Sequence, residues 1–281
     1  MDLRGHRGAS SPELFTGTLG VERLLAFAAH PDDIDFGAAA TVAALAERGV
    51  EVTLCLLTAG DAGGFEPGRD AEHIAALRRK EQQAAAEVLG IGEVLFLQER
   101  DGFVEPTMAL QREVVRVMRQ VRPDMVLTSH PERAWDRLQK AHPDHLACGE
   151  AVVRACYPAM ENPFAFPELL QEEGLQAFRL RYLLLMGAPV ERVTTRIDVT
   201  GYERIKVEAL RRHFSQHPHP QSMEDYVLNG MRAIFAEARE AADKEAAEDA
   251  PEQGIGGLRE EGFAEEFHLV TVNGPDTISG F

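Results

Sequence analysis

Cysteine is scarce in this chain of 281 residues, with only Cys55, Cys148 and Cys156, and none of them belongs to a CxxC pair. An odd number of scattered cysteines predicts no disulfide framework and favours small buried side chains in a reducing, cytoplasmic environment. Long apolar runs are also missing: no stretch is long enough to span a membrane, and the N-terminal residues contain no apolar signal-peptide core. We therefore expect a soluble cytoplasmic protein.

Positive charge is likewise in the minority, with 29 Lys and Arg residues against 46 Asp and Glu and a formal net charge of −17 at pH 7. A surplus of negative charge repels phosphate groups, so the composition argues against nucleic acid and anionic membranes as partners. A GxGxxG turn does not follow the first predicted strand, which argues against a dinucleotide-binding protein.

Apolar strands and amphipathic helices alternate along the first half of the chain. Strands are predicted near 24–29, 51–60, 93–97 and 124–128, and the helices between them cover 36–49, 70–89 and 106–121. Gly49 and Gly90 are the expected helix ends. This order predicts an α/β fold, a Rossmann-like and mostly parallel sheet with helices on both faces, extended by extra C-terminal strands and helices.

The second half of the chain departs from this alternation. Strands are predicted at 181–186 and 192–199, a helix at 202–214, a charged helix from 223, and a last strand near 263–272. We see no clean boundary and predict a single domain over residues 1–281. Within it, residues 1–20 are expected to be an N-terminal tail, and residues 240–262 a charged helix end and link.

A polar cluster follows the first strand, where His30, Pro31, Asp32 and Asp33 lead into the alanine-rich helix. The carboxyl ends of parallel strands are where ligands bind. Imidazole and carboxylate groups suit zinc or a similar divalent ion, and a bound cation relieves the cost of placing two carboxylates together. Because Pro31 prevents a regular helix, His30 and Asp33 can face one point. An Asp that only caps the helix explains the same residues, so both interpretations stay open.

A second cluster, HPDH at 142–145, lies beyond the fourth strand and also leads into a helix. A single His at such a place is more often a surface residue. Two strand ends of one parallel sheet that each carry an HPD unit instead indicate a shared site. Three protein ligands with an open position for water describe a catalytic zinc, whereas structural zinc sites are usually closed by four ligands rich in Cys.

HPDD at 30–33 together with HPDH at 142–145, on an α/β chain of this size, resembles the PIG-L/LmbE family of zinc-dependent N-deacetylases. This family includes the deacetylases of mycothiol and bacillithiol biosynthesis and the mycothiol-conjugate amidase. Other segments look like family elements: TAGDAGG at 58–64, Arg78 with Glu81, Asp101-Gly102, and KVEALRRHFSQ at 206–216. Family members frequently have a glutamate after HPDD, in the sequence HPDDE, whereas this chain has Ile34 at that position. The resemblance implies a hydrolase that removes an N-acyl group, chiefly acetyl, from an amino-sugar conjugate such as an N-acetylglucosaminyl compound.

By this resemblance the metal ligands are His30, Asp33 and His145, and Asp32 is the general base. The implied metal is Zn²⁺, although Fe²⁺ fits the same ligand set. Elementary chemistry of amide hydrolysis points to the same groups. A divalent metal lowers the pKa of a water molecule to about 7 and polarises the acyl oxygen. A carboxylate beside the metal but not bound to it can then take a proton from that water.

The resemblance also assigns His142 to the histidine that stabilises the oxyanion, and Asp144 to the carboxylate that orients and charges it. Arg78 and Asp101 match residues that contact the sugar part of the substrate. Simpler interpretations stay open: Asp144 as an N-cap of the following helix, and Arg78 on the solvated face of a charged helix.

Two other functions compete with the deacetylase. One is an amidase that acts on larger thiol or antibiotic conjugates, and the other is a catalytically silent, metal-containing binding protein. The presence of Asp32 and His142, neither of which is needed to hold a metal, argues against the silent protein. A homo-oligomer is expected only from the general preference of proteins for symmetric assemblies.

Two C-terminal features have no assigned role. The proline-containing segment 158–178 breaks the alternation and would either wall the pocket or form a subunit contact. His213, His217 and His219 lie in a loop-like tract, which is interpreted as a loop or pocket lining rather than a second metal site.

Overall fold

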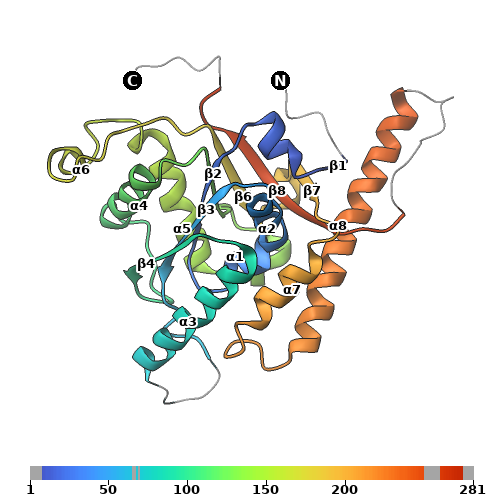
Figure 1. Ribbon diagram of the computed structural model, residues 1–281, viewed down its shortest axis with the longest axis horizontal. Helices are drawn as coiled ribbons and strands as arrows, with labels where there is room; N and C mark the ends of the chain where they lie inside the picture. Colours follow the sequence, from blue (N-terminus) through green and yellow to red (C-terminus); the bar gives the residue numbers. More distant parts are fainter. Residues whose placement is uncertain (1–7, 65–67, 69, 250–259, 275–281) are drawn as a thin grey trace.

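The computed structural model describes residues 8–64, 68, 70–249 and 260–274 (Figure 1). Within these residues, eight strands form one sheet in the order β1-β7-β8-β6-β5-β2-β3-β4. The strands are β1 (Ala9–Ser10), β2 (Arg23–Ala28), β3 (Glu51–Thr58), β4 (Glu93–Glu99), β5 (Met125–Ser129), β6 (Tyr182–Met186), β7 (Thr195–Asp198) and β8 (Ala264–Thr271). Only β8 is antiparallel to its neighbours, β6 and β7, and the other described pairs are parallel. The prediction of a mostly parallel sheet is confirmed.

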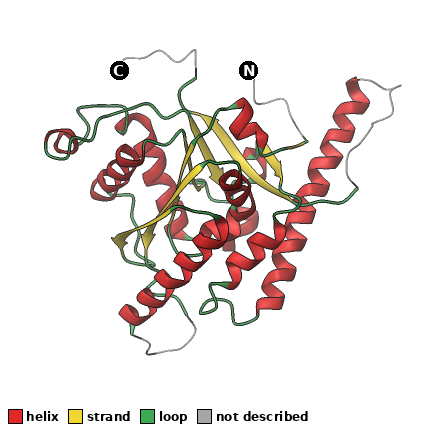
Figure 2. Ribbon diagram, in the orientation of Figure 1, coloured by secondary structure: helices red, strands yellow, loops and turns green. Residues whose placement is uncertain are grey.

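Helices cover both faces of this sheet (Figure 2). The helices are α1 (Asp33–Gly37), α2 (Ala39–Glu47), α3 (Ala71–Leu89), α4 (Met108–Val121), α5 (Pro143–Arg154), α6 (Pro167–Gln171), α7 (Glu203–Arg211) and α8 (Pro220–Asp249). Helices α2, α3 and α7 pack together on one face, while α4 and α5 pack on the other. Helix α8 runs beside β1, β7 and β8. In the described part of the chain, none of the helices is both long enough and apolar enough to cross a membrane.

Strand β2 shows why the first apolar run carries no charge after Arg23. Leu24 and Ala26 belong to the core under α2, α3 and α7, whereas Leu25 and Phe27 belong to the core under α4 and α5. Side chains alternate between the faces of a strand, so a strand covered on both sides must be apolar throughout. The run therefore places the polar residues that follow it at the carboxyl edge of the sheet.

Two expectations near the N-terminus are wrong. Part of the predicted tail belongs to the fold, because β1 pairs with β7 and Phe15 is fully buried. The predicted helix over 36–49 is two helices, since the backbone of Ala38 has a φ of −148° and interrupts the helical path. At the other end, α8 reaches Asp249, and residues 250–259 of the predicted link lie outside the described residues.

The segment 158–178 packs away from the pocket. Buried Arg119 on α4 donates hydrogen bonds to the carbonyl oxygens of Ala159, Asn162 and Ala165. Three carbonyl groups on one guanidinium tie the segment to α4. None of its described residues is among those that line the pocket described below, so the expectation of a pocket wall is wrong.

Candidate active site

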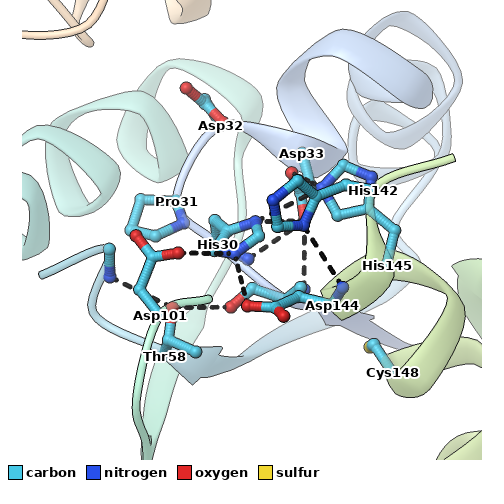
Figure 3. A network of polar contacts seen from close by, with 12 residues as sticks. His30, Pro31, Asp32, Asp33, Thr58, Asp101, His142, Asp144, His145 and Cys148 are labelled. Atoms are coloured by element: carbon cyan, nitrogen blue, oxygen red, sulfur yellow. Dashed lines mark hydrogen bonds and ion pairs between the residues drawn. The ribbon is translucent and has the colours of Figure 1, made fainter. Parts of the chain in front are cut away.

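The two HPD clusters meet at the carboxyl edge of the sheet (Figure 3). Strands β2 and β5 are neighbours, and the residues after each strand converge on one pocket of about 620 Å³. The residues predicted for the site that line this pocket are His30, Asp32, Asp33, Arg78, Asp101, His142 and His145. Asp144, the remaining predicted residue, lies just beneath, with its side chain buried. The residues that follow the two strands thus lie around one pocket, and their assignment as a catalytic site stays a prediction.

Donor atoms of the three predicted metal ligands lie close together. Oδ1 of Asp33 is 3.0 Å from Nε2 of His145. Nδ1 of His30 is 3.3 Å from the same His145 nitrogen and 3.7 Å from Oδ2 of Asp33. These distances gather the imidazoles of His30 and His145 and the carboxylate of Asp33 around one point, with His145 facing Oδ1 of Asp33 and His30 facing Oδ2. His142 borders the same point, with a ring nitrogen within 4.8 Å of those of His30 and His145.

The charges of these groups are strongly coupled. Burial lowers the pKa of His30, but hydrogen bonds and charges from Asp101 and Asp33 outweigh it and raise the pKa to about 11. Burial also lowers the pKa of His145, and the charge of Asp33 more than reverses this. Burial raises the pKa of Asp33, yet His145 and His30 hold it well below its usual value. An ionised carboxylate is thus balanced by imidazole protons, which a bound cation would replace.

Backbone groups fix the orientation of Asp33. Its Oδ2 accepts hydrogen bonds from the N–H groups of Ala29 and His30, each at 3.0 Å, and these groups precede α1. Asp32 occupies the N-cap position of α1 but makes no side-chain capping hydrogen bond. The interpretation of these aspartates as simple helix caps is therefore wrong.

The second ring nitrogen of His30 faces two carboxylates. Nε2 is 3.0 Å from Oδ1 of Asp101 and 3.1 Å from Oδ2 of Asp144. Metal-binding histidines usually donate their other N–H to a carboxylate, which fixes the tautomer and makes the ligand nitrogen more basic. His30, Asp101 and Asp144 also form a second set of closely spaced donors, but hydrogen bonding among them accounts for that spacing.

Asp144 is held by the loop that follows β4. Its side chain is only 1% exposed, and its carboxylate accepts hydrogen bonds from the N–H groups of Gly102 at 2.7 Å and Val104 at 3.4 Å. It does not cap α5: His142 occupies the N-cap, and its Nδ1 accepts the N–H of Asp144 at 3.2 Å. The carboxylate therefore contacts His30 directly, while its charge also opposes the lowering of the pKa of His142 by burial, so the expected role of charging His142 stays a prediction.

The surroundings of His142 lower the pKa of its imidazole. Burial lowers its pKa, and the charges of His30 and His145 lower it further, against the opposing effect of Asp144 and Asp101. Because Nδ1 accepts a backbone hydrogen bond, the ring hydrogen of the neutral form lies on Nε2. A neutral imidazole of this kind polarises a carbonyl group in other enzymes. The expected cationic role of His142 stays a prediction.

Asp32 lines the same pocket as the three predicted metal ligands. Its backbone has a φ of 89°, a left-handed conformation that is uncommon for residues other than Gly, and its N–H donates to Oε1 of Gln82 at 2.9 Å. Its carboxylate points away from the other labelled groups in Figure 3. Oδ2 is 3.5 Å from both Nη2 of Arg78 and Nε2 of His217.

Arg78 is buried, at 4% exposure, while Arg79 and Lys80 beside it are exposed. The solvated-face interpretation is therefore right for those neighbours and wrong for Arg78. The Arg78 guanidinium donates to the carbonyl oxygens of Pro31 at 2.7 Å and Gly60 at 3.3 Å. A Cβ on Gly60 would lie 2.3 Å from Nη1 of Arg78, so only glycine leaves this space free.

His217 is the main residue that sequence reasoning failed to place. Besides facing Asp32, its ring makes an edge-on contact with Phe36 at 5.0 Å between centroids. His213 is fully buried, with Nε2 3.3 Å from Oδ2 of Asp35, and His219 is exposed just before α8. The only available signal was proximity to HFSQ at 213–216, which does not distinguish among these three histidines.

Comparison with known proteins places these residues in context. Residues 25–156 match the family model described as PIG-L: GlcNAc-PI de-N-acetylase, a range that contains both HPD motifs. Diacetylchitobiose deacetylase of Thermococcus kodakarensis is 30% identical over 202 residues, which cover 70% of this chain and 71% of that protein. Probable N-acetyl-alpha-D-glucosaminyl L-malate deacetylase 2 of Bacillus anthracis is 31% identical over 194 residues, which cover 66% of this chain and 78% of that protein.

The fold also has a solved counterpart. N,N'-diacetylchitobiose deacetylase from Pyrococcus horikoshii aligns with a TM-score of 0.74 at 21% sequence identity. The alignment covers 92% of this chain and 91% of that one. At this identity the likeness shows the fold, which agrees with the predicted α/β class.

Proposed function

Because this chain belongs to the PIG-L family of de-N-acetylases, we propose that it removes an acyl group, chiefly acetyl, from the nitrogen of an amino-sugar conjugate. The two relatives named above are, by their names, deacetylases of N-acetylated sugar compounds. The substrate class proposed here is therefore an N-acetylglucosaminyl compound. A catalytic Zn²⁺ is the proposed metal, because two imidazole nitrogens and one carboxylate oxygen suit it. Fe²⁺ suits the same donors.

One observation supports the proposal more than any other. Asp33 has a donor atom 3.0 Å from that of His145, whereas the neighbouring Asp32 points away from this group while lining the same pocket. A protein that only held a metal would not need a second carboxylate with a strained backbone at this place. A hydrolase needs one, because a general base must be close to the nucleophilic water without being bound to the metal.

In the proposed reaction, Asp32 and His142 have different tasks. When bound, the ion supplies Lewis acidity by lowering the pKa of a water molecule and polarising the acyl oxygen. Asp32 accepts the proton of the attacking water and later returns it to the leaving amine. His142 donates from Nε2 to the oxygen on which negative charge develops, a contribution typically worth about a hundredfold in rate.

The remaining residues bind and orient the substrate. Arg78 and Asp101, both on the pocket wall, offer donors and acceptors for the sugar hydroxyl groups. Cys55, Cys148 and Cys156 are free and buried, which supports a reducing compartment, and we assign the protein to the cytoplasm.

The test compares Asp32→Asn with Asp33→Asn. Acetate release from N-acetylglucosamine and its glycosides is measured for zinc-loaded and chelated protein, with metal content measured in parallel. We expect Asp33→Asn to lose the metal, and Asp32→Asn to keep it while losing about 10²–10⁴-fold in kcat. Glu87→Gln, an exposed site on α3, is the control. Acetate release by Asp32→Asn at the wild-type rate would refute the proposed base.

A further inference from the structure

The pocket extends well beyond the proposed catalytic residues. Its lining runs from the HPD residues across the ends of β6 and β8 to the middle of α8. A volume of about 620 Å³ lies in the range of pockets that enclose drug-sized ligands. An amide and one sugar ring at the HPD end would leave the α8 end to another part of the substrate. Helix α8 also lies outside the range 25–156 that the family model matches. The α8 end of the pocket is therefore built by a part of the chain that the family model does not describe.

The wall at the α8 end is apolar. Tyr226, Val227, Gly230, Met231 and Ile234 all line the pocket, and their spacing along the helix places them on one face. Met186 at the end of β6 lines the same pocket. Methionine side chains adapt to ligands of different shape, because they are unbranched and flexible.

The charged pair near this wall needs no ionic ligand. Lys206 and Glu265 line the pocket, but the Lys206 ammonium donates to Oε1 of Glu265 at 2.6 Å and to the carbonyl oxygen of Phe36 at 2.6 Å. Glu265 also accepts the N–H groups of Ala40 and Thr41 at the start of α2. Both charges are thus compensated within the protein.

Gly230 leaves open space in the pocket beside α8. Glycine is unfavourable inside a helix, yet Gly230 stands in the middle of α8 with no turn or positive φ that requires it. A Cβ added there would find no atom within 4 Å, so the space beside this pocket-lining residue is open. A larger side chain at this position has room to grow without a clash.

We infer that the α8 subsite, formed by Met186, Tyr226, Val227, Gly230, Met231 and Ile234, binds an uncharged apolar group of the substrate. This inference rests on the proposed deacetylase function. The group is either an acyl chain longer than acetyl or an apolar aglycone on the sugar, because the chemistry of the wall suits both.

Two substrate series distinguish a longer acyl chain from an apolar aglycone as the group that binds to the α8 subsite. One series is glucosamine with N-acyl chains from acetyl to hexanoyl, and the other is N-acetylglucosamine with O-alkyl groups from methyl to hexyl. The free amine formed is measured in both series with the zinc-loaded protein, which gives kcat/KM for each member. Each methylene that becomes buried is expected to raise kcat/KM by up to about fourfold. A rise in only one series identifies the acyl chain or the aglycone as the occupant.

Variants of Gly230 test whether the rise in kcat/KM with chain length arises at the α8 subsite. Gly230→Leu is expected to abolish most of the rise in kcat/KM with chain length, because its side chain would occupy the space that the apolar group needs. Gly230→Ala should retain most of the rise. Gly17→Leu is the matched control, because Gly17 is exposed, has no atom within 4 Å of an added Cβ, and lies outside the pocket lining.

The outcomes separate the two claims. Turnover of acetyl substrates with no rise in either series would overturn the α8 subsite and leave the deacetylase function standing. A rise that persists in Gly230→Leu would overturn the location. An absence of amine release from every member, with metal bound, would remove the proposed function and the subsite together.

Discussion

The contact between Asp144 and His30 leads to a test of what Asp144 does. Asp144 lies two residues after His142, with its N–H 3.2 Å from Nδ1 of that ring, and the family resemblance implies that it acts on that histidine. In the structure its carboxylate instead accepts hydrogen bonds from His30 Nε2 and from the N–H of Gly102. Asp144→Asn keeps the size of the side chain and removes its charge, so it changes only the hydrogen bonding and the electrostatics.

The expected magnitude follows from the number of donors around the side chain. An Asn oxygen placed at the Oδ2 position keeps the Gly102 and His30 contacts, but its NH₂ group then faces the N–H of Val104. A buried donor left without an acceptor costs about 1–3 kcal/mol in the free energy of unfolding. Loss of the carboxylate behind a metal-binding histidine lowers metal affinity about 10–100-fold.

Zinc affinity, kcat at saturating zinc and the urea unfolding curve are measured for Asp144→Asn. If Asp144 acts through His30, zinc affinity falls 10–100-fold and kcat at saturating zinc changes little. Asp124→Asn is the control, since Asp124 also accepts two backbone N–H groups, from Glu22 and Arg23, but at the opposite edge of the sheet. It should lose stability and keep zinc affinity. Unchanged zinc affinity in Asp144→Asn with a large loss of kcat would refute our assignment and restore His142 as the partner.

Two further predictions concern histidines away from the metal donors. His217→Ala removes a ring that faces Asp32, so kcat should fall roughly tenfold with metal content and Tm unchanged, and a loss of bound metal would contradict this. Burial lowers the pKa of both His130 and His268 from 6.5, so the unfolded chain binds protons first and stability is lost as pH falls below about 6.5. His268→Asn should therefore show a smaller loss of unfolding free energy between pH 7.5 and 5.5 than wild type, and equal losses would contradict the assignment.

The sheet could be predicted because its strands obey a local rule. A strand such as β2, covered on both faces, must be apolar throughout, and such runs are visible without any knowledge of their partners. The two HPD clusters could be placed together for the same reason, since both follow strands of one parallel sheet. The two-residue strand β1 could not be predicted, because it exists only through its pairing with β7, more than 180 residues away in the sequence.

Assignments that depend on long-range contacts were harder. The role of Asp144 is decided by the loop after β4, which supplies two N–H groups from 40 and 42 residues away. The burial of Arg78 is decided by the carbonyl groups of Pro31 and Gly60, which a helical charge pattern does not reveal. In both places the local pattern suggested a common structural role, and hydrogen bonds with distant backbone groups determine where the side chain lies.

The segments that resembled the family only weakly acquire a common explanation in the structure. Arg78 and Gln82, one turn apart on α3, bind the carbonyl oxygen of Pro31 and the N–H of Asp32, the two backbone groups around the strained residue. Glu81, on the same buried face, accepts hydrogen bonds from the N–H and Oγ of Ser215, which anchors the loop that carries His217. A left-handed non-glycine residue persists only when its surroundings hold it there. Helix α3, through Arg78, Glu81 and Gln82, and the loop that contains Ser215 therefore have a structural task besides any contact with the substrate. Together they hold the backbone of Asp32 and the His217 ring that faces its carboxylate.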